Sequence, residues 1–455
     1  MKARSLFLLS LIILTGCATT IPDLVRLYGD QQGIVEQPPV IIIHGALGGR
    51  LSYRDTGVEA WPGPLNKLVF SNYQRLELEI DPLTMAPAES SLQPSGIAEV
   101  IGGVDFYGRV LDVLEEAAGY KASVPGIPNG GLERRYYTFS YDWRLDIVDS
   151  ARRLDAFIEQ IRTDYGKPEL EVDIVAHSLG GLITRYYVRY GTVDVLNGNT
   201  FPVTQAGAQK IRRVALLGTP NLGSAGALRT LMRGYRVIFG TIPTEVVATF
   251  PSTYLVLPHA IVDWFVTTSG KPLERDQFDY NFWRRFNFSV FDPEVEQRIY
   301  ERYEDPKEAE AHLWLLRRFF RKNLERARRF SWSLTVPVEE PKVKYVVFGG
   351  SCDPTPARII VEEVDGVSKV RLFPDEVKNP LPNIDYEKLM LEPGDGVVTK
   401  ASLLARQTFD PTVARHKYSF FPLDYPMFLC ETHASLTGNI DFQNNLLHAL
   451  LSVDQ

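Results

Sequence analysis

The stretch Asp173-Ile-Val-Ala-His-Ser178-Leu-Gly-Gly-Leu182 places a serine between a short apolar run and two glycines. The residues before Ser178 have the composition of a buried strand, and those after it carry apolar side chains at helical spacing as far as Gly191. A serine at such a strand–turn–helix junction stands clear of the sheet if small residues lie two positions before and two after it. Ala176 and Gly180 occupy these positions, so the pattern predicts that Ser178 is a nucleophile at a sharp turn.

Strand and helix patterns alternate along most of the chain. Runs with strand composition cover residues 40–43, 136–141, 170–175, 210–217, 342–350 and 417–422, and helical spacing recurs in residues 110–118, 151–165, 182–190 and 442–451. Asp149 and Ser150 are the expected cap of the second of these helices. The alternation predicts an α/β protein with a mostly parallel sheet and helices on both faces. With the serine turn, it predicts the α/β-hydrolase fold.

The order of the patterns predicts five segments. They are a lipoprotein signal peptide (1–16), a lipidated cysteine and tether (17–37), the N-terminal part of the core (38–220), an inserted cap or lid (221–340) and the C-terminal part of the core (341–455). Residues 309–330 of the cap are predicted to be helical and carry seven basic residues between Arg317 and Arg329. Such a helix either lies on an anionic lipid surface or packs its apolar face on the core, and we favour packing.

The beginning of the chain is typical of an export signal. Two basic residues among the first four precede an apolar run that is too short to cross a bilayer. The following Leu14-Thr-Gly-Cys17 resembles a bacterial lipoprotein cleavage box, which implies removal of residues 1–16 and a lipid anchor on Cys17. The resemblance to bacterial lipoproteins also implies, from Ala18 after the cysteine, sorting to the outer membrane of the cell envelope. The alternative is an ordinary cleaved signal peptide with an incidental cysteine.

Charge and cysteine content narrow the possible functions. Lys and Arg number 49 against 56 Asp and Glu, giving a net charge of −7, so nothing indicates nucleic-acid binding. Cys352 and Cys430 are too few for a disulfide framework and do not have metal-ligand spacing. We therefore expect neither a metal nor a cofactor. The two thiols either pair in an oxidising compartment or remain free, and both alternatives stay open.

A second glycine-rich loop follows the first predicted strand. In Val40-Ile-Ile-Ile-His-Gly-Ala46, the glycine after the strand lets the backbone approach a ligand closely. A hydrolase of this fold places one oxyanion-hole N–H in this loop and the other on the residue after the nucleophile. We therefore predict an oxyanion hole made by the backbone N–H groups of Ala46 and Leu179. His44 is predicted to fill space beside the loop.

A serine nucleophile needs a base, and the base needs a carboxylate to orient it. In this fold the histidine follows the last strand. His433 has that place, whereas His416 would begin the last strand and His448 lies within the final helix. Asp353 and Asp395 both follow predicted strands, and the tight glycine turn around Asp395 favours it as the acid.

Several motifs in this order resemble the lecithin:cholesterol acyltransferase family. They are residues 39–49, Tyr141-Asp-Trp-Arg144, Ala176-His-Ser-Leu-Gly-Gly181, residues 250–258, Gly394-Asp-Gly-Val-Val398 and Glu431-Thr-His433. The resemblance implies Ser178, Asp395 and His433 as the catalytic residues. It also implies a phospholipid or other lipid-ester substrate, with an alcohol, sterol or glyceride as a possible acceptor. His44 stands where the family usually has a proline.

The expected function is acyl transfer on lipid esters, in the manner of an O-acyltransferase or phospholipase A, through an acyl-enzyme on Ser178. A plain carboxylester hydrolase such as a lipase is the main alternative. A thioesterase or peptidase could use the same residues, because this chemistry does not choose among carbonyl substrates. A non-catalytic surface lipoprotein on a hydrolase scaffold is the alternative from another class.

Overall fold

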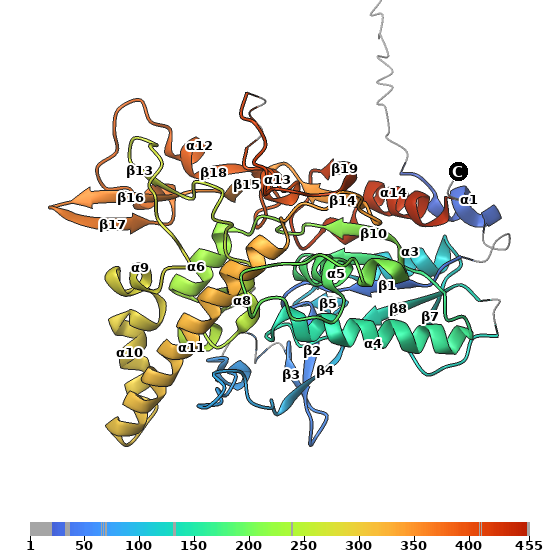
Figure 1. The fold of residues 1–455 in the computed structure, drawn as a ribbon, viewed down its shortest axis with the longest axis horizontal. Helices are drawn as coiled ribbons and strands as arrows, with labels where there is room; N and C mark the ends of the chain where they lie inside the picture. The colour runs from blue at the N-terminus through green and yellow to red at the C-terminus, as the bar shows by residue number, and fades with distance from the viewer. Residues whose placement is uncertain are drawn as a thin grey trace, which may run out of the picture.

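A seven-stranded parallel sheet forms the centre of the molecule (Figure 1). The computed structural model describes residues 21–31, 37–64, 66, 68, 71–130, 133–237, 240–408, 410 and 412–452. The strand order is β19-β14-β10-β9-β1-β8-β7, and each neighbouring pair is parallel. The strands are β7 (Lys121–Ser123), β8 (Arg135–Phe139), β1 (Val40–Ile43), β9 (Val172–His177), β10 (Ile211–Leu217), β14 (Tyr345–Gly350) and β19 (Leu423–Leu429).

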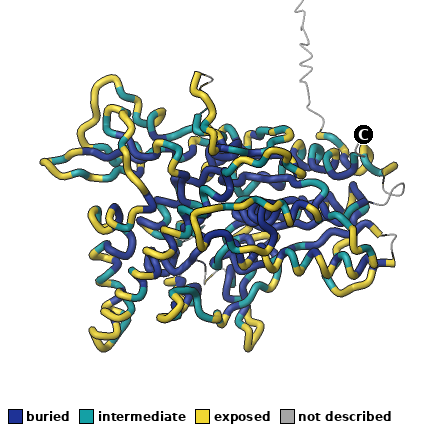
Figure 2. Tube along the Cα trace, viewed as in Figure 1, coloured by how far each residue is buried: buried dark blue, intermediate teal, exposed yellow. Residues whose placement is uncertain are grey.

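Helices cover both faces of this sheet. Val40 and Ile42 of β1 pack in one hydrophobic core with α3 (Gly108–Glu116) and α14 (Ile440–Leu451). Ile41 and Ile43 belong to the other core, which includes residues of α4 (Ile147–Tyr165) and α5 (Leu179–Tyr190). A strand buried on both faces needs apolar residues at every position, which is why β1 is a continuous apolar run. Figure 2 shows the central strands buried and the outer loops exposed. The predicted α/β-hydrolase architecture is confirmed.

The strand register sets where a site can form. Ile43 of β1 pairs with Ala176 of β9, and Leu217 of β10 pairs with His177. At the far side of β14, Gly350 pairs with Leu429 of β19. The carboxyl ends of these parallel strands therefore meet at one edge of the sheet, where ligands bind in open α/β sheets.

The cap is mainly helical and contains two small strand pairings. Its elements are α6 (Ala225–Arg233), β11 (Tyr235–Val237), β12 (Gly240–Ile242), α7 (Thr244–Val247), α8 (Pro251–Leu255), β13 (Phe265–Thr267), α9 (Tyr280–Arg285), α10 (Pro293–Tyr300) and α11 (Pro306–Ser333). Strand β13 pairs with β16 (Ile359–Val364), so the expected boundary at residue 340 does not separate the cap from the rest. A second excursion, after β14, adds β15 (Asp353–Pro356), β17 (Val367–Arg371), α12 (Tyr386–Met390) and β18 (Leu391–Gly394).

Shorter elements complete the part of the chain that the structure describes. They are α1 (Leu24–Tyr28), β2 (Gly49–Tyr53), β3 (Glu59–Trp61), β4 (Leu92–Ile97), β5 (Val100–Ile101), β6 (Val104–Asp105) and α13 (Lys400–Leu403). Strands β2, β3 and β4 form a separate antiparallel sheet beside the main one. None of the helices in the described ranges is both long and apolar enough to cross a lipid bilayer.

The basic helix α11 packs on the protein. Its buried side chains include Leu316 and Phe320, which face the core. Two of its basic side chains form ion pairs within the protein. Arg317 pairs with Glu296 on α10. Arg326 pairs with Asp146 at the start of α4 and with Asp194 in the loop after α5. The favoured alternative, a cap helix packed on the core, is therefore the observed one.

Two predicted details of the elements were wrong. The cap of α4 is Asp146, whose carboxylate accepts a hydrogen bond from the N–H of Val148 at 2.8 Å, so the helix begins before Asp149. The last strand is β19, not residues 417–422. Residues 417–422 have the aromatic composition of a strand, but they lie outside the regular strands. Phe421 is apolar because it is buried in the core, where its ring stacks on that of Tyr345 at the start of β14.

The expected tether is partly folded. Within it, Leu24 is buried and Tyr28 donates a hydrogen bond from its hydroxyl to the carbonyl oxygen of Asn444 on α14 at 2.9 Å. The helix at residues 24–28 is stabilised by the packing of Leu24 and Tyr28 on the second core. The predicted signal peptide and Cys17 lie outside the described residues, so the lipid anchor and the envelope location stay predictions.

Candidate active site

Ser178 stands at the turn between β9 and α5 with a strained backbone. Its φ of 53° and ψ of −119° are a conformation that residues with a side chain rarely adopt. Its N–H donates to the carbonyl oxygen of Leu217 at 2.8 Å, which fixes the turn to the neighbouring strand. A Cβ on Gly180 would lie 2.6 Å from the backbone oxygen of His44, so only glycine allows this close approach of helix and loop.

A continuous hydrogen-bonded chain connects Ser178, His433 and Asp395. His433 Nε2 lies 3.0 Å from Ser178 Oγ, and His433 Nδ1 lies 2.8 Å from Asp395 Oδ2. The backbone N–H of His433 also donates to the carbonyl oxygen of Asp395 at 2.8 Å. Ser178 follows β9, Asp395 follows β18, and His433 lies in the loop after β19. The three predicted side chains therefore meet at the carboxyl edge of the sheet.

The carboxylate of Asp395 is held in its ionised form. Burial opposes ionisation, but the nearby His433 and the N–H groups of Val398 and Val397 outweigh burial and lower the pKa of Asp395. Oδ1 accepts from Val398 at 2.7 Å and from Val397 at 3.0 Å, which leaves Oδ2 for the histidine. Each oxygen of the carboxylate thus has a separate task.

The other candidates for acid and base lie elsewhere. Asp353 begins β15 beside the end of β18, but in the described ranges its carboxylate forms no hydrogen bond or ion pair. His416 packs on Tyr418 in the loop before β19, and His448 is exposed on α14. None of these three side chains belongs to the hydrogen-bonded chain that includes Ser178, His433 and Asp395.

The two predicted oxyanion-hole residues, Ala46 and Leu179, border the same pocket as Ser178. Leu179 is the first residue of α5, so its N–H has no acceptor within the helix and faces outward from the helix end. The loop that holds Ala46 lies close to the serine, because a Cβ on Gly45 would be 2.8 Å from Ser178 Cβ. Both predicted donor residues thus lie at the pocket that contains Ser178.

An apolar pocket of about 410 Å³ opens beside Ser178. The cap contributes α6, β11 and α8 to its wall, and the rest of the chain contributes other parts, including the loops after β1, β8, β18 and β19. The apolar lining includes Leu47, Trp61, Ile101, Phe106, Trp143, Phe250 and Val256. A pocket of this size and composition fits a hydrocarbon chain.

Trp143 lines this pocket, whereas its neighbour Asp142 is not among the lining residues. The Asp142 carboxylate forms a buried ion pair with Arg144, in which Arg144 Nη2 lies 2.6 Å from Oδ2. The indole of Trp143 donates to the carbonyl oxygen of Gly49 at 3.2 Å and lines the pocket. Trp143 thus forms part of the pocket wall, and Asp142 holds the buried guanidinium of Arg144.

His44 fills space beside the loop, as predicted. It is completely buried and stacks on Tyr141 with ring centroids 4.2 Å apart. Burial lowers the pKa of His44 to about 4, so the ring is neutral at physiological pH. Sequence reasoning missed Tyr107, which directly precedes α3, and His177, the last residue of β9; both border the same pocket as Ser178. The position of His177 directly before the serine was the one signal for it.

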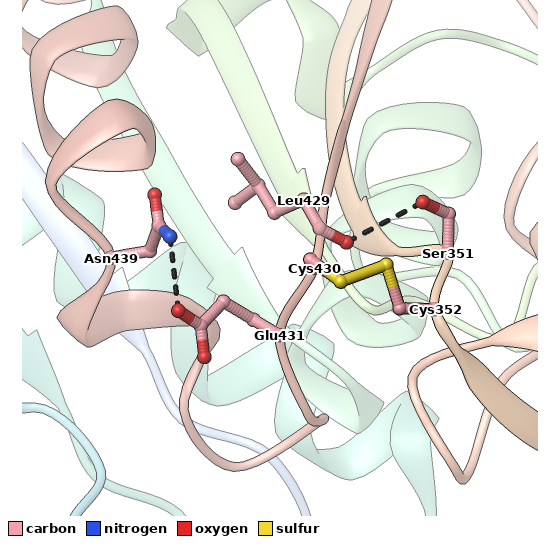
Figure 3. The surroundings of a disulfide bond; sticks show 6 residues. All are labelled: Ser351, Cys352, Leu429, Cys430, Glu431 and Asn439. Atoms are coloured by element: carbon pink, nitrogen blue, oxygen red, sulfur yellow. Dashed lines mark hydrogen bonds between the residues drawn. A yellow bond between two sulfur atoms is a disulfide. The ribbon is translucent and has the colours of Figure 1, made fainter. Parts of the chain in front are cut away.

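A disulfide between Cys352 and Cys430 lies next to the site (Figure 3). Cys352 precedes β15, which pairs with the strand that leads to Asp395, and Cys430 is three residues before His433. The carboxylate of Glu431, the residue after Cys430, accepts a hydrogen bond from the side-chain amide of Asn439 at 3.0 Å. Figure 3 shows this contact beside the disulfide. The cross-link thus joins the loop that carries His433 to the start of β15, the strand that pairs with β18 next to Asp395.

Removing this disulfide is expected to lower the free energy of unfolding by about 2–5 kcal/mol, because it closes a long loop. The Cys352→Ala/Cys430→Ala protein should unfold at a lower temperature than the oxidised parent. Reductant should lower the melting temperature of the parent and leave that of the double variant unchanged. Equal melting temperatures for the oxidised parent and the double variant would contradict the stabilising role.

The fold and the site geometry define an α/β-hydrolase. A model of the lecithin:cholesterol acyltransferase family matches residues 115–403, which is more than half of the 455-residue chain. The chain therefore belongs to this family. The matched range includes Ser178 and Asp395 and ends before His433. Membership places the chain among the lipid-ester hydrolases and acyltransferases.

Comparison with solved structures finds matches of low sequence identity, of which one has a TM-score above 0.5. The crystal structure of the Tle4–Tli4 complex contains a chain that is 15% identical, with a TM-score of 0.54 and coverage of 91% of this chain and 98% of that chain. Lipase BlEst2 of Bacillus licheniformis in its mature form is 12% identical, with a TM-score of 0.35 and coverage of 92% and 94%. Lipase 1 from Pelosinus fermentans is 12% identical, with a TM-score of 0.36 and coverage of 92% and 100%. The search of curated proteins finds no matching sequence.

Proposed function

We propose that this protein transfers acyl groups between lipid esters through an acyl-enzyme on Ser178. The observation that carries the proposal is the hydrogen-bonded chain from Ser178 Oγ through His433 to Asp395, which borders an apolar pocket. Family membership supports a lipid ester as the acyl donor. The pocket adjoins the serine, so a bound acyl chain brings its carbonyl carbon to the nucleophile.

In the first half of the reaction, Ser178 Oγ attacks the ester carbonyl carbon and its proton passes to His433 Nε2. The N–H groups of Ala46 and Leu179 stabilise the negative charge on the carbonyl oxygen. The bond to the leaving alcohol then breaks, and that alcohol takes the proton from His433. Asp395 keeps Nδ1 of the histidine protonated throughout and stabilises its positive charge.

In the second half, an acceptor hydroxyl gives its proton to His433 and attacks the acyl-serine. The bond between Ser178 Oγ and the acyl carbon breaks, and the serine regains its proton. Water and a lipid alcohol compete for this step. The apolar walls favour a lipid alcohol, because they bind hydrocarbon and exclude water.

A product assay tests the proposal. The purified protein is added to vesicles of phospholipid with a labelled acyl chain that also contain diacylglycerol or a sterol. We expect labelled, acylated acceptor, with none formed by the Ser178→Ala variant. Free fatty acid as the sole labelled product would reject acyl transfer and identify a carboxylester hydrolase. The absence of any labelled product would reject both.

A further inference from the structure

Two buried side chains beside the site take no part in the reaction steps above. Tyr107 directly precedes α3 and is 1% exposed, and His177 is the last residue of β9 and is 7% exposed. Tyr107 Oη lies 2.9 Å from His177 Nδ1, and the two rings meet edge to face. Polar groups buried to this degree are costly unless each finds a partner, so their hydrogen bonds identify what they hold in place.

The hydrogen bonds of this pair extend to two other loops. The N–H of Gly45, the residue before Ala46, donates to Tyr107 Oη at 2.8 Å. At the other end, His177 Nε2 lies 3.1 Å from the backbone oxygen of His433. A single chain therefore connects the loop after β1, the serine turn and the loop after β19.

The two groups at the ends of this hydrogen-bonded chain, the N–H of Gly45 and the carbonyl oxygen of His433, determine which atoms carry the protons. The hydroxyl of Tyr107 accepts from Gly45, so it donates its own proton to His177 Nδ1. His177 then carries its proton on Nε2, which donates to the carbonyl oxygen of His433. Burial, followed by the nearby His433, lowers the pKa of His177 to about 3, so the ring stays neutral and keeps this tautomer.

The loop after β1 packs tightly against Tyr107 and His177. A Cβ on Gly48 would lie 2.7 Å from Tyr107 Oη. A Cβ on Gly45 would lie 3.2 Å from His177 Nδ1. The rings of His177 and His433 are also close, with centroids 4.7 Å apart. The contacts of Tyr107 and His177 thus define the spacing of the loops around Ser178.

We propose that Tyr107 and His177 are positioning residues that hold the Ala46 N–H and His433 at fixed distances from Ser178. This inference rests on the proposed function, because it concerns the placement of the oxyanion donor and the base. Such a donor must lie about 2.7–3.1 Å from the developing charge. A displacement of about 1 Å in an active site can lower the rate about 10²-fold.

The first test removes the hydroxyl of Tyr107 and keeps its ring. Tyr107→Phe is expected to lower kcat about 10–100-fold with KM unchanged, because the lost contact matters in the transition state and not in lipid binding. The matched control is Tyr120→Phe. Tyr120 is 2% exposed, and in the described part of the chain its hydroxyl has no hydrogen-bond partner. This control should leave kcat and KM within twofold of the parent.

The second test changes His177, at the other end of the same hydrogen-bonded chain. It can be carried out even if Tyr107→Phe fails to fold. His177→Gln retains an amide N–H that can reach the carbonyl oxygen of His433, whereas His177→Leu retains none. We expect the glutamine variant to retain a kcat at least tenfold above that of the leucine variant. In the double variant Tyr107→Phe/His177→Leu, kcat should equal that of His177→Leu alone, because residues that act as a unit are not additive.

These outcomes separate the inference from the proposed function. A parent protein without ester turnover would reject the proposed function. A parent protein with turnover, together with a Tyr107→Phe variant of equal kcat, would overturn the positioning role alone. Multiplicative losses in the double variant, or equal kcat for the glutamine and leucine variants, would overturn it as well. A rise in KM at constant kcat would assign these residues to substrate binding instead.

Discussion

Ser178→Ala is expected to lower the rate of ester turnover by about 10⁶-fold. The variant loses the atom that forms the bond to the acyl carbon, so no acyl-enzyme can form. What remains is binding in the pocket and stabilisation by the backbone donors, which give about 10³–10⁴-fold over water. The measurement is the rate of release of a labelled fatty acyl group from phospholipid vesicles.

The substitution should leave the fold intact. Ser178 holds its turn through its backbone N–H, which donates to Leu217 and is retained in alanine. The melting temperature should therefore change little. A fluorophosphonate probe should label the parent and fail to label Ser178→Ala. The matched control is Ser333→Ala, a buried serine whose hydroxyl bonds within α11, which should keep full turnover and labelling. Turnover by Ser178→Ala above one per cent of the parent would contradict the assignment of the nucleophile.

The central sheet could be predicted from the sequence because its strands are buried on both faces. Such strands are continuous apolar runs, and β1 and β14 are examples. The turn at Ser178 could be predicted for a similar reason. It needs small residues at fixed positions, and Gly180 lies too close to the backbone of His44 for any side chain.

The last strand could not be located in this way. Strand β19 lies at the edge of the sheet and its residues are mostly part-exposed, so an apolar run does not mark it. It also contains Pro426, which an edge strand tolerates and which argues against a strand in a sequence pattern. His433 could still be identified, because the base follows the last strand even when the strand's bounds are shifted by a few residues.

Contacts between residues far apart in the chain could not be predicted from the sequence. The hydrogen bond of Tyr107 joins it to a histidine 70 positions away, and no local pattern around residue 107 indicates it. The pairing of Cys352 with Cys430 depends on a Cα–Cα distance of 5.0 Å that follows from the arrangement of β14 and β19. Sequence could only leave that pairing open. The pairing of β13 with β16 likewise joins segments on either side of β14.

Asp395→Asn is expected to lower kcat by about 10⁴-fold while the fold is retained. The reason lies in the two tasks of the carboxylate. Oδ1 accepts from the N–H groups of Val397 and Val398, so in the variant the amide oxygen must take this position. The amide NH₂ then faces His433 Nδ1, which must accept and therefore loses its proton. The proton moves to Nε2, which can no longer accept one from Ser178.

Stability should also depend on pH in a way that the variant lacks. The pKa of Asp395 is lower in the folded protein than its ordinary value, as burial is outweighed by His433 and the backbone N–H groups. The stabilisation is therefore present above the unfolded pKa, about 4, and is lost as the pH falls through the lowered folded pKa. The parent should have the higher melting temperature at pH 7, and the two curves should converge in acid.

The carboxylate that sequence reasoning left as the alternative supplies the matched control. Asp353 lies at the start of β15, next to the strand that leads to Asp395, so Asp353→Asn makes the same chemical change close by. Its carboxylate does not contact His433, and we expect kcat within threefold of the parent. A loss of about 10⁴-fold in Asp353→Asn with normal turnover in Asp395→Asn would reverse the two assignments. Normal kcat in both variants would show that the histidine does not need a carboxylate to hold its tautomer.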